Sequence, residues 1–227
     1  MKVGLFSTCI NSIYFTRTVA ATRLVLERLG VEILETEQVC CGQMHINSGY
    51  PDLAKPLVDK VEKNFSKVDY IVAPSASCIG SLREHEDRPE LVAKSLDLSE
   101  FLVDILKVTD VGATFNHRVT FHTTCHSLRV AKLGDKPLQL LNNVKGIEVI
   151  ELPAADSCCG FGGTFSVKNS DVSGAMLADK ISSIESTQAR YVVSADNSCL
   201  MHIGGGLQRE KDAIEVIHLA EVLASRG

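Results

Sequence analysis

The chain has 227 residues, a formal net charge of −5 and a hydrophobic content of 45%, values typical of a globular protein. This composition argues against intrinsic disorder, and no run of Lys or Arg predicts a nucleic-acid partner. No stretch approaches the ~20 apolar residues of a membrane span, and the N-terminal segment 1–8 does not resemble a secretory signal. We therefore expect a cytoplasmic protein, in which thiols stay reduced and disulfides are rare.

The first half of the chain alternates predicted strands with predicted helices. A short apolar strand at 3–6 is followed by a helix at 19–29, where the apolar residues have helical spacing. A second strand is predicted at 31–34, a helix at 53–65 and a third strand at 70–73. Strands that alternate with helices predict a parallel sheet with right-handed crossovers.

The second half of the chain repeats the first. A shift of 116 residues aligns the segment 5–9 with 121–125, and later segments align at shifts of up to 121, as small loop insertions would require. Strands are accordingly predicted at 119–122, 147–150 and 191–194. We therefore predict an α/β fold of two tandem halves, 1–112 and 113–227, each with a parallel sheet and related by an approximate two-fold axis.

The eight cysteines follow the same repeat. The first set is Cys9, Cys40, Cys41 and Cys78, and the second set is Cys125, Cys158, Cys159 and Cys199. Each set contains an adjacent pair that is followed by glycine, Gly42 or Gly160. A single buried cysteine is commonly a small core residue, but a repeated Cys-Cys-Gly with flanking cysteines at matched distances is not expected by chance. Because thiolates are the preferred ligands of iron–sulfur clusters and closed zinc sites, the two sets predict two soft-metal sites.

Every cysteine comes shortly after a predicted strand. Parallel sheets bind ligands in the crevice beyond the C-terminal ends of their strands, so we expect each set to converge there. Adjacent residues of a straight strand point to opposite faces, so the pair needs a turn, which glycine can supply with a positive φ. Backbone N–H groups of Gly42, Gly160, Gly162 and Gly163 are expected to contact the bound group. The run 204–206 (Gly-Gly-Gly) predicts a turn.

Three functions stay open on these residues alone. The leading hypothesis is an electron-transfer subunit with iron–sulfur clusters, since no nucleophile–base arrangement and no flavin or nicotinamide fingerprint stands out. A structural zinc or scaffold protein is the second hypothesis, with both sites closed by four cysteines. A thiol–disulfide reductase is the third, because converging cysteines would also serve exchange chemistry.

The motifs around the cysteines resemble those of the cysteine-rich CCG domain family, which includes the B subunit of heterodisulfide reductase and the iron–sulfur subunit of glycolate oxidase. The resemblance covers nearly the whole chain, and the motifs that carry it lie at 40–43, 47–50, 73–78, 158–165 and 198–205. It implies an iron–sulfur protein that works with other subunits in the oxidation of L-lactate to pyruvate. Any association with a membrane would be peripheral and through those partners.

The chain departs from the heterodisulfide reductase pattern, in which each motif ends in Cys-x-x-Cys. The last position is Ser81 in the first half and His202 in the second. Four thiolates remain in each half, enough for a [4Fe-4S] cluster, or for zinc in one of the sites. His202 and His126 lie close to second-half cysteines and could bind metal, although such a histidine is more often a hydrogen-bonded neighbour. These polar side chains predict a tighter metal site in the second half.

Overall fold

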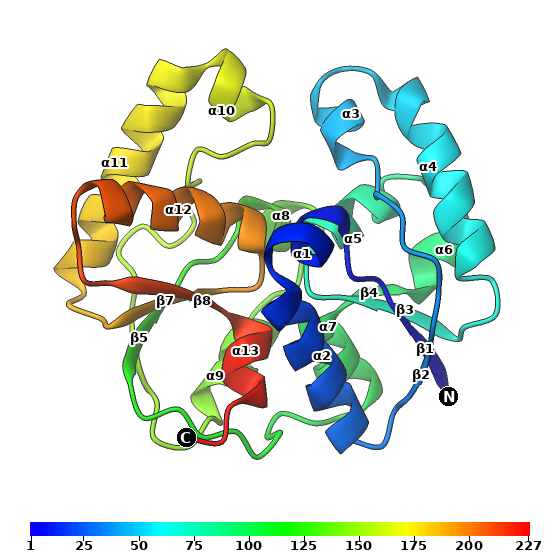
Figure 1. Cartoon of the computed structure of the whole chain (residues 1–227), viewed down its shortest axis with the longest axis horizontal. Helices are drawn as coiled ribbons and strands as arrows, with labels where there is room; N and C mark the ends of the chain where they lie inside the picture. The colour runs from blue at the N-terminus through cyan, green and yellow to red at the C-terminus, as the bar shows by residue number, and fades with distance from the viewer.

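The structure, a computed structural model that describes residues 1–227, contains two sheets of four parallel strands each (Figure 1). The strand order is β2-β1-β3-β4 in the first sheet and β6-β5-β7-β8 in the second. The strands are β1 (Lys2–Leu5), β2 (Glu32–Leu34), β3 (Tyr70–Ala73), β4 (Ser95–Asp97), β5 (Arg118–Phe121), β6 (Glu148–Ile150), β7 (Tyr191–Ser194) and β8 (Glu215–His218). The α/β class and the two parallel sheets are therefore confirmed.

Helices connect the strands in both halves. The first half contains α1 (Cys9–Tyr14), α2 (Thr16–Arg28), α3 (Gln43–Asn47), α4 (Pro51–Asn64), α5 (Ala76–Arg83), α6 (Pro89–Lys94), α7 (Leu98–Glu100) and the π-helical turn η1 (Phe101–Ile105). The second half contains α8 (Cys125–Arg129), α9 (Lys136–Asn142), α10 (Phe165–Lys168), α11 (Ser170–Ser186), α12 (Asn197–Arg209) and α13 (Leu219–Ala224). None of these helices is long and apolar enough to cross a membrane.

Reciprocal helix contacts relate the two halves by an approximate two-fold axis. Helix α2 packs on α13, while α9, the counterpart of α2, packs on α7, the counterpart of α13. In the same way α1 contacts α12 and α8 contacts α5. Figure 1 shows α3 with α4 and α10 with α11 as two projections on opposite sides of this arrangement. The predicted pseudo-symmetry is confirmed.

The largest hydrophobic core is shared between the halves. It combines side chains such as Val3 and Phe101 of the first half with Val119 and Val193 of the second. A smaller core lies under each cysteine set, around Phe65 in the first half and around the second-half helices α11 and α12. The repeat boundary between residues 112 and 113 stays a prediction, because the shared core runs across it.

Two features differ from the sequence-based expectation. A fourth strand, β4 or β8, which was not predicted from the sequence, extends each sheet. The predicted turn at 204–206 is wrong, because these glycines lie inside α12. Their small size has a packing role: a Cβ on Gly206 would lie 2.4 Å from Ile181 Cδ1 of α11. The glycines therefore permit close packing of α12 rather than a chain reversal.

His218 gives the fold a predictable sensitivity to acid. Its Nδ1 atom caps α13 by accepting a 3.0 Å hydrogen bond from the backbone N–H of Ala220, and burial lowers its pKa to about 4. An unfolded chain has a histidine pKa near ~6.5, so between these values the unfolded state binds more protons and the contribution to stability falls as the pH falls.

We expect His218→Asn, which keeps a capping oxygen, to remove this contribution. The pH dependence of the free energy of unfolding should flatten by up to ~1.4 kcal/mol per pH unit between about pH 4 and 6.5. Urea unfolding at several pH values measures the slope. The same slope in the variant and the parent protein would contradict this account of the cap.

Candidate metal centre

All eight cysteines line one cavity of about 460 Å³ between the two halves. Cys9 and Cys125 begin α1 and α8, and Cys78 and Cys199 lie in the first turns of α5 and α12. The two adjacent pairs occupy the loops after β2 and β6. The predicted placement at the C-terminal rims of both sheets is therefore confirmed, and the pseudo-two-fold axis brings the two rims together.

In the first half, the thiols form a compact hydrogen-bonded group around Cys40. The Sγ atoms of Cys9 and Cys40 are 3.8 Å apart, and the backbone N–H of Gly42 donates to Cys40 Sγ at 3.4 Å. Hydrogen bonds from the thiols of Cys41 and Cys9 hold the pKa of Cys40 well below its ordinary range. Deprotonation is therefore favoured at Cys40, because hydrogen-bond donors surround its sulfur.

The second half repeats this arrangement around Cys158. The backbone N–H of Gly160 donates to Cys158 Sγ at 3.4 Å, and hydrogen bonds from the thiols of Cys125 and Cys159 lower the pKa of Cys158. The sequence repeat thus extends to individual hydrogen bonds. Gly162 and Gly163 line the cavity in the left-handed conformation, and their role as donors to a bound group stays a prediction.

The glycine after each pair is required by both conformation and space. Gly42 and Gly160 have φ values of +85° and +90°. A Cβ on Gly42 would lie 2.8 Å from Ala54 Cβ, and a Cβ on Gly160 would lie 2.6 Å from the carbonyl oxygen of Ser173. Each cysteine pair therefore turns directly against the second helix that follows it in the chain, α4 or α11, which makes Ala54 and Ser173 structural counterparts.

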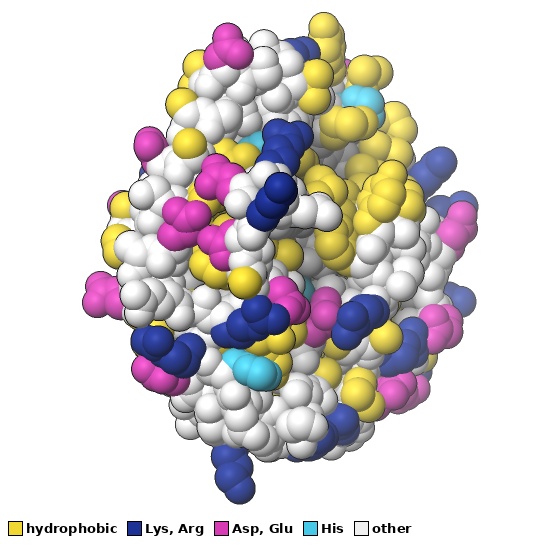
Figure 2. Space-filling model, turned by 60° about the vertical axis from the view of Figure 1, so that its left-hand side comes forward, with side chains coloured by type: hydrophobic (Ala, Val, Ile, Leu, Met, Phe, Trp, Pro, Cys, Tyr) yellow, Lys and Arg dark blue, Asp and Glu magenta, His cyan; other side chains and the backbone are white.

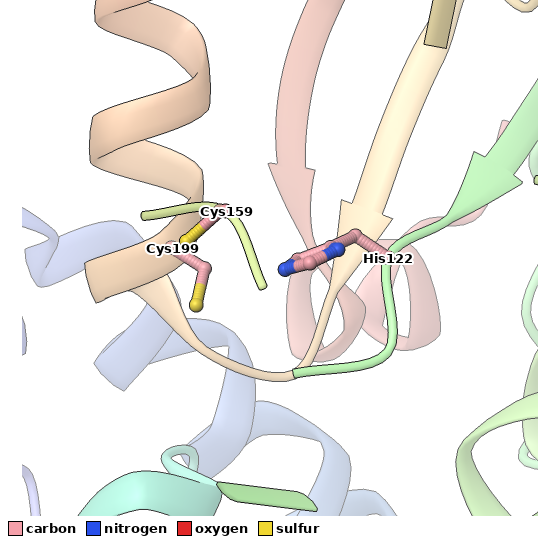
Figure 3. A group of neighbouring side chains, drawn as sticks. All are labelled: His122, Cys159 and Cys199. Atoms are coloured by element: carbon pink, nitrogen blue, oxygen red, sulfur yellow. The ribbon is translucent and has the colours of Figure 1, made fainter. Parts of the chain in front are cut away.

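One histidine beside the second cysteine set was missed in the sequence. His122 directly follows β5, and its ring nitrogen and the Sγ atoms of Cys159 and Cys199 all lie within 4.8 Å of one another (Figure 3). The side chain is 0% exposed, and neither ring nitrogen has a hydrogen-bond partner. Burial lowers the pKa of His122 to about 4. The only sequence signal was its alignment with Phe6, a histidine in place of a core aromatic residue.

A buried lysine also distinguishes the second half. Lys180 of α11 is 0% exposed and donates a 2.7 Å hydrogen bond to the carbonyl oxygen of Ala154. Burial lowers its pKa, while attraction from the nearby Cys159 opposes this shift. When Ala54 is aligned with Ser173, the first-half counterpart of Lys180 is Val61, which is equally buried. The second-half site therefore has a polar side chain at a position where the first-half site has an apolar one.

The two histidines that the sequence marked as possible ligands lie differently. His126 contacts the Gln43 side chain across the cavity, with 2.9 Å between the Nε2 atoms, and its Nδ1 is 3.6 Å from Cys125 Sγ. His202 Nε2 is 3.4 Å from Ser173 Oγ. Both therefore contact neighbouring polar groups, and His122 is the histidine that converges with two thiols.

Hydrogen bonds between the halves hold the two cysteine sets in fixed relation. The carboxylate of Asp196, the N-cap of α12, accepts from the backbone N–H of Ser77 in α5 at 2.9 Å. Ser48 Oγ and Thr164 Oγ1 are 3.0 Å apart across the mouth of the cavity. The helix ends that carry the cysteines are thus linked directly, so the cavity is a built feature of the fold.

The donors fit a soft metal. Each half offers four sulfurs, and the backbone N–H donors and helix N-termini around them stabilise thiolate charge. In a tetrahedral site with metal–sulfur bonds of 2.3 Å, neighbouring sulfurs lie about 3.8 Å apart, and the Cys9 and Cys40 sulfurs have this separation. This pair of sulfurs therefore has the separation that two ligands of one shared ion would have.

Comparisons with known proteins agree with this architecture. Two α/β halves, each with a Cys-Cys-Gly turn and two further cysteines at one rim, define a tandem cysteine-rich domain protein. The family model CCG, described as a cysteine-rich domain, matches residues 3–83 and 119–204. The chain therefore belongs to the CCG cysteine-rich domain family, in the group of proteins named lactate utilization protein A.

Curated relatives with that name match over essentially their whole length. The protein of Oceanobacillus iheyensis is 43% identical over 98% of this chain and 96% of its own. Those of Geobacillus sp. (strain WCH70) and Bacillus subtilis (strain 168) are 45% and 42% identical, each over 100% of both chains. Among solved structures, an aspartate racemase homologue from Pyrococcus horikoshii aligns over 98% of this chain and 95% of its own, with a TM-score of 0.37 and 12% identity.

Proposed function

We propose that this protein is an iron–sulfur electron-transfer subunit of a system that oxidises L-lactate to pyruvate. The observation that carries the proposal is the convergence of all eight cysteines on one cavity between the halves. The name of its full-length relatives, lactate utilization protein A, supports the link to lactate. Closely spaced thiolate sites suit one-electron transfer, because a short path joins the two centres.

Each half would hold one centre at its own cysteine set. The thiolate ligands are proposed to come from Cys9, Cys40, Cys41 and Cys78 in the first half and from Cys125, Cys158, Cys159 and Cys199 in the second. When bound, a [4Fe-4S] cluster supplies one-electron redox chemistry. The backbone amides of Gly42, Gly160, Gly162 and Gly163 would stabilise the negative charge at the sulfurs.

Exposed apolar side chains at the cavity mouth support docking of a partner subunit. Met44 of α3 and Val167 of α10 line the cavity, although their side chains are 55% and 81% exposed. Figure 2 shows hydrophobic side chains gathered beside a hollow on this side of the molecule. Isolated exposed apolar residues are common, but a group at the entrance to a buried redox site is typical of a contact surface. A partner bound there would come close to both centres.

A zinc-binding structural role is the second candidate, favoured by the 3.8 Å separation of the Cys9 and Cys40 sulfurs. The two functions are distinguished by anaerobic purification followed by EPR of the dithionite-reduced protein. For the proposed function we expect signals of reduced clusters, which L-lactate also produces once the partner subunits are added. A colourless protein with bound zinc would establish the alternative, and a protein without metal whose thiols turn over a small disulfide would favour thiol–disulfide chemistry.

Lys180 provides a further expected result that separates folding from metal binding. A buried lysine with one hydrogen-bond partner costs stability in the metal-free chain, so Lys180→Met should leave the free energy of unfolding unchanged or increase it. The same change removes a positive charge beside the second-half thiolates and should weaken metal binding there by about 10- to 100-fold. Competition with a chelator measures the affinity. Equal losses of stability and affinity would contradict this role for Lys180.

A further inference from the structure

His122 occupies a position that packing alone does not explain. Its backbone is held at the end of β5, where its N–H donates to the Val193 carbonyl at 2.8 Å and its own carbonyl accepts from Ser194 Oγ at 2.9 Å. The ring nitrogens nevertheless have no partner in a fully buried site. An unsatisfied buried polar group costs about 1–3 kcal/mol of stability. An apolar residue would therefore fill this space at a lower cost than histidine.

The first half shows that an apolar residue is compatible with this place in the fold. Phe6, the counterpart of His122, is fully buried and packs edge-on against Phe65 with ring centroids 5.6 Å apart. Phe6 also belongs to the core that contains Cys41 and Cys78. The two halves therefore differ at a residue beside the converged thiols, with a hydrocarbon ring in one half and an imidazole in the other.

The imidazole extends from the end of β5 toward the thiols of Cys159 and Cys199 (Figure 3). One ring nitrogen and the two sulfurs lie within 4.8 Å of one another. Sites with two or three cysteines and one histidine are common for zinc, and histidine also replaces cysteine on iron in some iron–sulfur centres. A neutral imidazole in a fully buried, thiol-rich site is therefore most readily satisfied by a metal.

We propose that His122 is a direct metal ligand in the second half, forming a mixed imidazole–thiolate site with Cys159 and Cys199, while the first half binds metal through thiolates alone. This inference rests on the proposed metal-binding function of the cavity. One further donor comes from the remaining second-half thiols, Cys125 and Cys158. The two sites are then chemically different although the fold is pseudo-symmetric.

The difference would give electron transfer a direction. Replacing a thiolate by a neutral imidazole reduces the negative charge of a site and raises its reduction potential. The buried ammonium of Lys180 acts in the same sense, and the first half has Val61 in its place. The second-half centre would therefore accept electrons from the first-half centre.

The test uses cadmium as a probe of the ligands. The full chain, labelled with ¹⁵N-histidine, is made metal-free under anaerobic conditions, loaded with two equivalents of ¹¹³Cd²⁺ and studied by ¹¹³Cd NMR. We expect two resonances in the thiolate range, of which one shifts toward mixed sulfur–nitrogen ligation and is split by coupling to ¹⁵N. His122→Phe, which installs the first-half residue, should abolish the splitting and leave the other resonance in place.

His202→Ser and His126→Ile are matched controls, because they install the first-half residues Ser81 and Ile10, and both should keep the splitting. If His122→Phe does not fold, retention of the splitting in both controls excludes His126 and His202, and loss of the splitting in His122→Gln tests His122 itself. Two unsplit thiolate resonances in the parent protein, a splitting that survives in His122→Phe, or its loss in a control would overturn the inference. Absence of any resonance in the thiolate range would instead overturn the proposed metal-binding function.

Discussion

Cys159→Ser is expected to abolish the tighter of the two metal sites, whereas Cys41→Ser should abolish only the weaker one. The two cysteines are counterparts in the repeat and are both buried. The second-half site has Lys180 and His122 close to its thiols, while the first half has Val61 and Phe6. Such surrounding groups typically change metal affinity by about 10- to 100-fold.

The comparison is made at one equivalent of metal per chain, where the tighter site fills first. Cys41→Ser should then bind almost as much metal as the parent protein, and Cys159→Ser should bind it about 10- to 100-fold more weakly. Chelator competition and metal analysis of the desalted protein give both quantities. Equal losses of bound metal in the two variants, or a larger loss in Cys41→Ser, would show that the polar side chains of the second half do not make its site the tighter one.

Gly160→Ala is expected to destabilise the protein by about 3 kcal/mol, as the sum of a backbone and a packing effect. The positive φ of Gly160 costs a non-glycine residue about 1–2 kcal/mol, and forced overpacking adds about 1–3 kcal/mol. The added Cβ would lie 2.6 Å from the Ser173 carbonyl oxygen, a backbone atom that cannot move without shifting α11. The displaced loop carries Cys158 and Cys159, so metal binding in the second half should be lost as well.

Gly174→Ala is the matched control. Gly174 lies in α11 beside Ser173, its φ is not positive, and nothing lies within 4 Å of the position that a Cβ would take. Helix propensity then favours alanine by up to ~1 kcal/mol. Denaturant unfolding of both variants measures the difference, and a Gly160→Ala protein as stable as Gly174→Ala would contradict the role assigned to the turn.

The parallel-sheet halves were predictable because local patterns in the sequence determine them. The apolar runs at 70–73 and 191–194 became β3 and β7 at the predicted residues. The strands β4 and β8 were missed because β4 has a single apolar residue, Leu96, and β8 has only the pair Val216 and Ile217 between Glu215 and His218. The glycines at 204–206 were misread because the same residue serves turns and close helix packing, and only the tertiary contact with α11 distinguishes the two uses.

The site was predictable as two cysteine sets but not as one cavity. Strand order places each set at its own rim, whereas the union of the rims depends on how α1 and α8 pack against α12 and α5 in the partner half. His122 and Lys180 were missed because each is a single polar residue in an apolar pattern. Only the fold shows that the ring of His122 and the thiols of Cys159 and Cys199 converge.

Iron and acid-labile sulfide, counted per chain in anaerobically purified protein, test the central claim most directly. Two [4Fe-4S] centres predict about eight iron and eight sulfide atoms per chain, falling together during exposure to air as the released thiolates oxidise. Zinc and total thiols are measured on the same sample. A chain that holds zinc in place of iron, or one that holds neither metal and has all eight thiols free to react, would contradict the account.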